Sequence, residues 1–251
     1  MTLGEIIAAR IRQTGPVSLA DYMADCLLHP VHGYYTTRDP LGAKGDFVTA
    51  PEISQMFGEL IGLALAQCWL DQGQPAAFTL AELGPGRGTL MADALRAASR
   101  VRGFAEAAQL VLVEASPLLR DRQAEALAAH DPRWIGAVGD LPGQPLYLVA
   151  NEFFDALPVR QFQRAETGWR ERQVGLEGGA LALGLAAEGA YPALDERQAD
   201  TRPGDIVELC PAAATVAGEV ARRIADHGGA ALFLDYGDWH SLGDTVQALK
   251  D

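Results

Sequence analysis

The chain has few cysteines and no long hydrophobic segment. Its 251 residues include only Cys26, Cys68 and Cys210, far apart and without a C-x-x-C pair, a pattern that indicates neither a disulfide framework nor a metal site. The longest apolar stretch, residues 61–70, is about half as long as a membrane-spanning helix, and the N-terminus lacks the features of a secretory or transit peptide. We therefore expect a cytoplasmic protein without membrane insertion or bound metal.

Basic side chains are also scarce. The sequence has 20 Lys and Arg against 33 Asp and Glu, a formal net charge of −13. Because no basic cluster offsets this charge, we expect no nucleic-acid partner and no general affinity for anionic lipid. The content of 49% apolar and 21% charged residues excludes disorder and is typical of a folded globular protein of one or two domains.

The first part of the chain has the pattern of helices. Apolar residues recur at helical spacing over 3–12, and Ser18 is placed to cap a second short helix. Residues 29–50 are rich in Gly, Pro, Asp and Thr, which predicts an ordered loop long enough to be functional. A helix over 51–70 follows. Its predicted inner side carries Ile53, Met56, Phe57, Leu60, Ile61 and Leu65.

From residue 76 onward, short apolar runs alternate with alanine-rich helices, which predicts an α/β fold with a parallel sheet. The predicted strands are 78–83, 110–114, 133–138, 146–151 and 230–235, and the predicted helices are 88–100, 117–130 and 212–226. Between 159 and 185 the apolar residues alternate in twos around glycine-bearing turns, so we expect an inserted antiparallel β meander there.

The strongest motif is Glu82-Leu-Gly84-Pro-Gly86-Arg-Gly88, at the point where the first predicted strand gives way to a helix. Glycines allow a sharp turn and a close approach of ligand to the backbone, and a helix N-terminus offers unpaired N–H groups. The dinucleotide fingerprint would place its third glycine at position 89, which is Thr89. The spacing therefore favours S-adenosylmethionine (SAM) over NAD. A tight strand-to-helix turn without a ligand is the alternative.

Two acidic residues follow the next strands. Glu114 closes the second strand, about 30 residues after Gly84, where such folds place the acid that accepts hydrogen bonds from ribose hydroxyls. Asp140 lies just after the third strand, where the adenine ring is expected. A surface carboxylate at a strand end is the simpler alternative for each of them.

The fourth strand ends in Asn151-Glu152-Phe153-Phe154-Asp155. The carboxyl ends of parallel strands form the ligand crevice of an open sheet, so these residues lie where a methyl acceptor would be held. Two acids and two aromatic rings suit a cationic, planar group. In the alternative, both rings belong to the core and Glu152 only caps a helix.

Together with 29–35, 45–59 and 234–237, the 82–88 and 151–158 motifs make the chain resemble the MidA family of class I SAM-dependent methyltransferases nearly from end to end. The resemblance implies a Rossmann-like sheet with an N-terminal helical cover. It places the 45–59 segment over the SAM pocket, with Asp46, Thr49, Glu52 and Gln55 as polar contacts. The expected domains are a cover and cofactor loop over 1–75 and a SAM-binding domain over 76–251.

The sequence after Asp235 has no apolar runs for the two antiparallel strands that normally close such a sheet. These C-terminal strands are therefore expected to be missing, and the chain is expected to be a piece of a longer protein.

The mitochondrial relatives in that family are protein arginine methyltransferases that act in assembly of respiratory complex I. The resemblance thus implies methylation of an arginine on a partner protein, such as a respiratory complex subunit. From their place at the end of the fourth strand, we expect Asn151, Glu152 and Asp155 to be the catalytic residues. Two other functions stay open. One is a non-catalytic SAM-binding assembly or scaffold factor, and the other, which Thr89 disfavours, is an NAD-dependent oxidoreductase. The sequence carries no signal of oligomeric state.

Overall fold

The computed structural model describes residues 1–38, 46, 49–237 and 243–247, and it divides the chain into two compact units. One unit comprises Tyr34–Ala156 and Ala213–Tyr236, and the other comprises Met1–Gly33, Leu157–Ala212 and Gly237–Asp251. These units differ from the expected domains, 1–75 and 76–251. The N-terminal helices pack against the inserted antiparallel strands, where Ile7, Ile11 and Leu19 share a core with Val174, whereas residues 34–75 belong with the parallel sheet.

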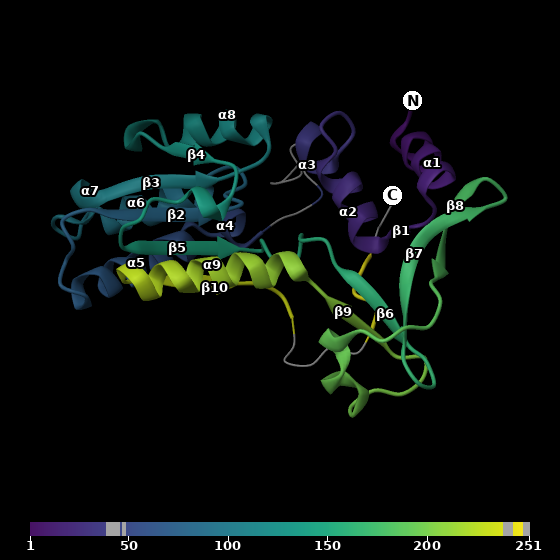
Figure 1. Cartoon of the computed structure of the whole chain (residues 1–251). Coiled ribbons are helices and arrows are strands. Elements are labelled where there is room, and N and C mark those ends of the chain that lie inside the picture. The colour runs from purple at the N-terminus through teal and green to yellow at the C-terminus, as the bar shows by residue number, and fades with distance from the viewer. Residues whose placement is uncertain (39–45, 47–48, 238–242, 248–251) are drawn as a thin grey trace. The chain divides into compact units, whose positions relative to one another are not determined.

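The first unit is built on a five-stranded parallel sheet, which confirms the predicted α/β fold (Figure 1). Side by side, its strands are β10 (Gly229–Leu234), β5 (Leu146–Asn151), β2 (Phe78–Leu83), β3 (Ala108–Val113) and β4 (Arg133–Ile135). The chain runs from β2 to β3 and β4 on one side and then returns to β5 and β10 on the other. The point where this order reverses, between β2 and β5, is where open α/β sheets bind ligands.

Helices cover both faces of this sheet because alternate strand residues are apolar on each side. One face packs against α5 (Gln55–Asp71), α6 (Thr89–Ala98) and α7 (Phe104–Ala107), with Phe78 and Leu80 in the shared core. The other face packs against α9 (Pro211–His227) through Val220, and Ala81 and Leu83 lie in that core. The remaining elements of this unit are α3 (Tyr34–Thr37), α4 (Ala50–Ile53), α8 (Pro117–Ala126), η1 (Ala128–His130) and η2 (Val138–Asp140).

The helix predicted over 51–70 is broken, and its predicted inner side is correct for Phe57, Ile61 and Leu65 but wrong for the other three residues. Ser54 adopts an extended conformation, φ −146°, ψ 118°, which separates α4 from α5. Although Ile61 and Leu65 are buried, Ile53, Met56 and Leu60 are exposed. The buried face instead contains Gly58 and Gly62. A Cβ on Gly62 would lie 2.3 Å from the carbonyl oxygen of Ala94, so the two helices approach closely through glycine rather than through large apolar side chains.

The second unit confirms the inserted antiparallel meander. Its strands are β1 (Val17–Ser18), β6 (Arg160–Arg164), β7 (Trp169–Glu177), β8 (Ala180–Leu185) and β9 (Ile206–Leu209), and all their pairings are antiparallel. The predicted N-terminal helices are α1 (Leu3–Thr14) and α2 (Leu19–Leu28), and the Ser18 hydroxyl caps α2 by accepting from the Asp21 N–H. Two short 3-10 helices, η3 (Pro192–Leu194) and η4 (Glu196–Gln198), complete the unit.

In the part of the chain that the structure describes, no helix is both long and apolar enough to cross a bilayer.

Candidate functional site

The predicted site residues of the parallel-sheet unit follow the carboxyl ends of neighbouring strands. The register pairs Leu83 of β2 with Val113 of β3 and Ala150 of β5, and Asn151 of β5 with Leu234 of β10. The glycine loop, Glu114, the 151–155 segment and Asp235 therefore leave the sheet at the same edge. This edge includes the point between β2 and β5 where the strand order reverses.

The glycine loop connects β2 to α6 with a backbone that other residues rarely adopt. Gly84, Gly86 and Gly88 all have positive φ, 59°, 55° and 84°. A Cβ on Gly84 would lie only 2.9 Å from the Phe153 ring, so glycine is required there by close packing as well as by the turn. The loop ends at the N-terminus of α6, whose first N–H groups suit a polar or anionic ligand.

Glu82 lies beneath this loop and is buried, with an exposed fraction of 2%. Burial, reinforced by the nearby Glu114, raises the pKa of Glu82 to about 8, so the side chain is mainly protonated at neutral pH. Its Oε2 atom is buried and has no hydrogen-bond partner among the described residues. An orphaned buried oxygen is costly, and a polar ligand could satisfy it.

Glu114 is held in one orientation at the end of β3. Its Oε1 accepts from the Ser116 N–H at 2.7 Å, and its Oε2 accepts from Gln123 Nε2 at 3.1 Å. The Arg120 guanidinium donates to the backbone oxygen of Glu114. Burial raises the pKa of Glu114, while the hydrogen bonds from Ser116 and Gln123 oppose that shift. Glu114 is thus a buried, oriented acceptor.

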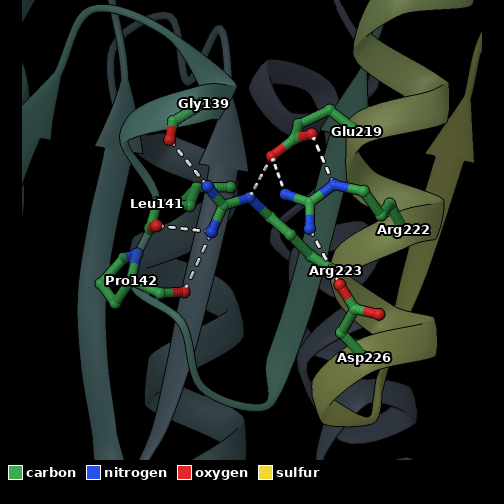
Figure 2. A network of polar contacts seen from close by, with 7 residues as sticks. All are labelled: Gly139, Leu141, Pro142, Glu219, Arg222, Arg223 and Asp226. Atoms are coloured by element: carbon green, nitrogen blue, oxygen red, sulfur yellow. Dashed lines mark hydrogen bonds and ion pairs between the residues drawn. The ribbon is translucent and has the colours of Figure 1, made fainter.

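The segment that contains Asp140 is fixed by α9 (Figure 2). Arg223, which is buried, donates to the backbone oxygens of Gly139 at 2.7 Å, Leu141 at 2.5 Å and Pro142 at 3.2 Å. Glu219 neutralises the same guanidinium at 2.7 Å. Asp140 itself is exposed at the end of η2, so the structure fixes its backbone while its carboxylate stays accessible.

Of the predicted cofactor contacts in 45–59, Glu52 is the one whose side chain contacts the glycine-loop region within the described residues. Glu52 on α4 reaches the glycine-loop region, where Thr89 Oγ1 donates to its Oε1 at 2.6 Å and Arg87 lies 3.8 Å from its Oε2. Asp46 accepts a hydrogen bond from the Tyr34 hydroxyl. Thr49 precedes α4 without a side-chain cap, and Gln55 begins α5 with its side chain exposed. Residues 45, 47 and 48 of this segment lie outside the described residues.

After β5, the chain makes a strained turn that gathers carboxylates. Glu152 has φ 49°, which is uncommon for a residue with a side chain and is often found at functional sites. The pKa of Asp155 is raised to about 6, mainly by partial burial and further by the nearby carboxylates of Asp235 and Glu152. Asn151, the last residue of β5, is half-buried. Within the described residues, neither Glu152 nor Asp155 forms an ion pair.

Asp235 shapes this turn from the end of β10. Its Oδ2 accepts from the N–H groups of Phe154 at 2.9 Å and Asp155 at 3.2 Å. The ring of Phe154 packs edge-on against the exposed Phe233 of β10 at a centroid distance of 4.9 Å. Phe153 and Phe154 are half-buried and pack against the apolar core of the sheet, as the simpler alternative had it. Glu152 does not cap a helix there, because no helix begins after it.

The sequence did not reveal three residues that hold this edge together. Gln123 and Arg223 lie inside predicted helices. Apart from Glu219, their partners lie outside those helices, so no local motif marks them. Trp134, which donates to Gln123 at 2.7 Å, lies in a short strand with no distinctive pattern. A polar residue on the apolar side of a predicted helix is the only available signal for Gln123.

Known proteins resemble this chain over most of its length. The model of a family described as "putative S-adenosyl-L-methionine-dependent methyltransferase" matches residues 60–251. The zebrafish (Danio rerio) protein named protein arginine methyltransferase NDUFAF7, mitochondrial, is 38% identical over 97% of this chain and 64% of its own length. The human protein of the same name is 38% identical, over 96% of this chain and 60% of its own length.

A solved structure supports the same relationship. A Burkholderia thailandensis protein, crystallised with bound S-adenosyl-homocysteine, superimposes with a TM-score of 0.80 at 31% identity, covering 94% of this chain and 62% of that protein. The chain thus spans less than two thirds of the length of these relatives.

The relatives overturn one expectation. The zebrafish and human relatives are named as mitochondrial proteins, so the predicted cytoplasmic location is wrong. That prediction depended on two observations. Sparse cysteines indicate only that thiols stay reduced, a condition that other compartments also meet, and an N-terminus without the features of a transit peptide does not by itself determine the compartment.

Proposed function

The chain belongs to the family of S-adenosyl-L-methionine-dependent methyltransferases, as its resemblance to MidA predicted, and from this premise we propose that it transfers a methyl group from SAM to an arginine of a partner protein. The observation that carries the proposal is the meeting of the glycine loop and the oriented Glu114 carboxylate at one edge of the parallel sheet. Relatives named as protein arginine methyltransferases support the choice of acceptor.

The residues of the cofactor side fit SAM. The turn through Gly84, Gly86 and Gly88 brings the first N–H groups of α6 to the carboxyl edge of the sheet, and Glu114 offers an oriented acceptor for the ribose hydroxyls. The buried, unpartnered oxygen of Glu82 could bond a polar group of the cofactor. Asp140 would lie near the adenine.

From the 45–59 segment, the proposed contacts are Asp46, Thr49, Glu52 and Gln55. Glu52 already contacts Thr89 at the start of α6, so its role includes holding the segment against the glycine-loop region. When bound, SAM supplies an electrophilic methyl group on its sulfonium.

On the acceptor side, we assign the guanidinium to the carboxylates of Glu152 and Asp155. Charge-assisted hydrogen bonds from a planar guanidinium to carboxylates fix its orientation, and orientation is the main requirement of an in-line displacement. Because its pKa is about 6, Asp155 is ionised near neutral pH and can accept the proton that the nitrogen releases as it is methylated. Asn151, the last residue of β5, is the third residue that we assign to the acceptor side.

The partner we propose is a protein, with a subunit of a respiratory complex as the acceptor that the family resemblance favours. A competing function is that of an assembly or scaffold factor that binds SAM without turnover. The two functions share the cofactor side of the site and differ only in whether the carboxylates of Glu152 and Asp155 support transfer.

Calorimetric titration of S-adenosyl-homocysteine into the chain tests the cofactor side. Gly86→Val places a branched side chain at φ 55° in the glycine loop. Gly178→Val is a matched control, because Gly178 has nearly the same φ, 58°, in the β7–β8 hairpin, where an added Cβ meets nothing within 4 Å. We expect saturable binding by the parent and by Gly178→Val, and none by Gly86→Val. Absence of binding by the parent, or unchanged binding by Gly86→Val, would contradict the proposed cofactor side.

A further inference from the structure

Gln123 occupies an unusual place on α8. It has an exposed fraction of 0%, although glutamine is seldom buried without a reason. Its side chain makes three hydrogen bonds. Nε2 donates to the Gly86 backbone oxygen at 2.8 Å and to Glu114 Oε2 at 3.1 Å, and Oε1 accepts from Trp134 Nε1 at 2.7 Å.

The chemistry of the three partners fixes which way the carboxamide points. An indole N–H can only donate, so the atom that faces Trp134 must be the oxygen. A backbone carbonyl and a carboxylate can only accept, so the nitrogen must face Gly86 and Glu114. The reversed amide would oppose like groups at every contact. Trp134 therefore fixes the orientation in which Gln123 serves the other two residues.

Gln123 joins two parts of the candidate site that lie on different strand-to-helix connections. Gly86 is in the loop after β2, and Glu114 follows β3. The Ser116 N–H already occupies the other oxygen of Glu114 at 2.7 Å. With one bond to each oxygen, the carboxylate cannot rotate, yet each oxygen keeps a lone pair for a further donor.

We propose that Gln123 is a positioning residue for SAM, which sets the Glu114 carboxylate against the glycine loop so that it can accept from the ribose hydroxyls. This inference rests on the proposed function. It assigns to Gln123 a role that acts through Glu114, not a direct contact with the cofactor, and it makes Trp134 the residue that keeps the carboxamide in its working orientation.

The test compares two ligands in Gln123→Met. Methionine has a similar length and no donor, so it fills the space while it releases Glu114. The ligands are S-adenosyl-homocysteine and its analogue without the two ribose hydroxyls, both measured by calorimetry. We expect the variant to bind S-adenosyl-homocysteine about tenfold more weakly, as befits a lost hydrogen bond to a charged group, and to bind the analogue within about twofold of the parent.

A matched control is Gln161→Met in the other unit. Gln161 is also fully buried and bonded at both ends, to Glu208 and Asp244 through Nε2 and to Arg172 through Oε1. Its loss should lower the melting temperature while leaving the affinity for both ligands unchanged. This control separates general destabilisation from loss of positioning.

Trp134→Phe keeps the test decisive if Gln123→Met does not fold. Phenylalanine retains an aromatic ring and removes only the N–H that orients the carboxamide. The same selective loss is expected, about threefold for S-adenosyl-homocysteine and absent for the analogue. Equal losses for the two ligands, or no loss, in a folded variant would overturn the role of Gln123 while the parent still binds. A parent that binds neither ligand would overturn both the inference and the proposed function.

Discussion

The acidic residues in the two halves of the carboxyl edge of the parallel sheet lie in different environments. Beside β2 and β3, Glu82 is buried and mainly protonated, and Glu114 is bonded at both oxygens by neutral donors. Beside β5 and β10, Glu152 and Asp155 lie in one turn and Asp235 accepts hydrogen bonds from that turn, and among the described residues none of the three forms an ion pair. The first half orients acceptors for neutral hydroxyls, whereas the second keeps negative charge available for a cation.

The largest expected effect is on the affinity for S-adenosyl-homocysteine, which should depend on the acidic residue beside β3 and not on those beside β5. Glu114→Ala should weaken the binding of S-adenosyl-homocysteine about 100-fold, because two hydrogen bonds to a charged group are lost. Asp155→Ala should change that affinity by less than about twofold. Calorimetry on the two variants checks this. A loss of similar size in both would mean that the two halves are not specialised.

The next effect is a pH dependence on the acceptor side. Because the pKa of Asp155 is about 6, its carboxylate forms as the pH rises through that value and only then attracts a guanidinium. With SAM saturating, kcat/KM for an arginine-containing peptide should rise about tenfold between about pH 5 and about pH 7. Asp155→Asn should lack this rise. A variant that keeps the same profile would assign the titration to another group.

A smaller effect distinguishes two adjacent arginines on α9 (Figure 2). Arg223→Met removes the donors that hold the backbone of Gly139, Leu141 and Pro142, and it should weaken S-adenosyl-homocysteine binding about threefold and lower the stability by about 2 kcal/mol. Arg222→Met is the matched control, because Arg222 also pairs with Glu219 but is exposed. Equal losses in the two variants would remove any special role of the Arg223 contacts.

The last effect concerns the pH dependence of stability near Glu82 and not ligand binding. The folded state keeps the Glu82 proton up to about pH 8, whereas an unfolded carboxyl releases it near pH 4.5, so stability must fall as the pH rises between these values. The melting temperature of the parent should therefore fall by about ten degrees more than that of Glu82→Gln between about pH 5 and about pH 8. Parallel curves would show that Glu82 is ionised in the folded protein.

Features made of contiguous residues could be predicted from the sequence, whereas contacts between separate elements could not. Strands β2 and β5 begin and end at the predicted residues, because a continuous apolar run between turns is a local signal. The glycine loop and the 151–155 segment are contiguous strings at strand ends and were found for the same reason. The close contact of α5 with α6 was missed, since Gly58 and Gly62 carry no hydrophobic signal. The contacts of Gln123 with Gly86 and of Arg223 with Gly139 join residues on separate elements, and only the folded structure brings them together.

The most direct test of the central claim is methyl transfer itself. The chain is incubated with SAM labelled in its methyl group and an arginine-containing peptide, and mass spectrometry locates the label. We predict a labelled arginine with the parent, and with Glu152→Gln a turnover at least about tenfold lower at unchanged affinity for S-adenosyl-homocysteine. A parent that binds SAM without transferring the methyl group, or a Glu152→Gln variant that turns over like the parent, would contradict the account.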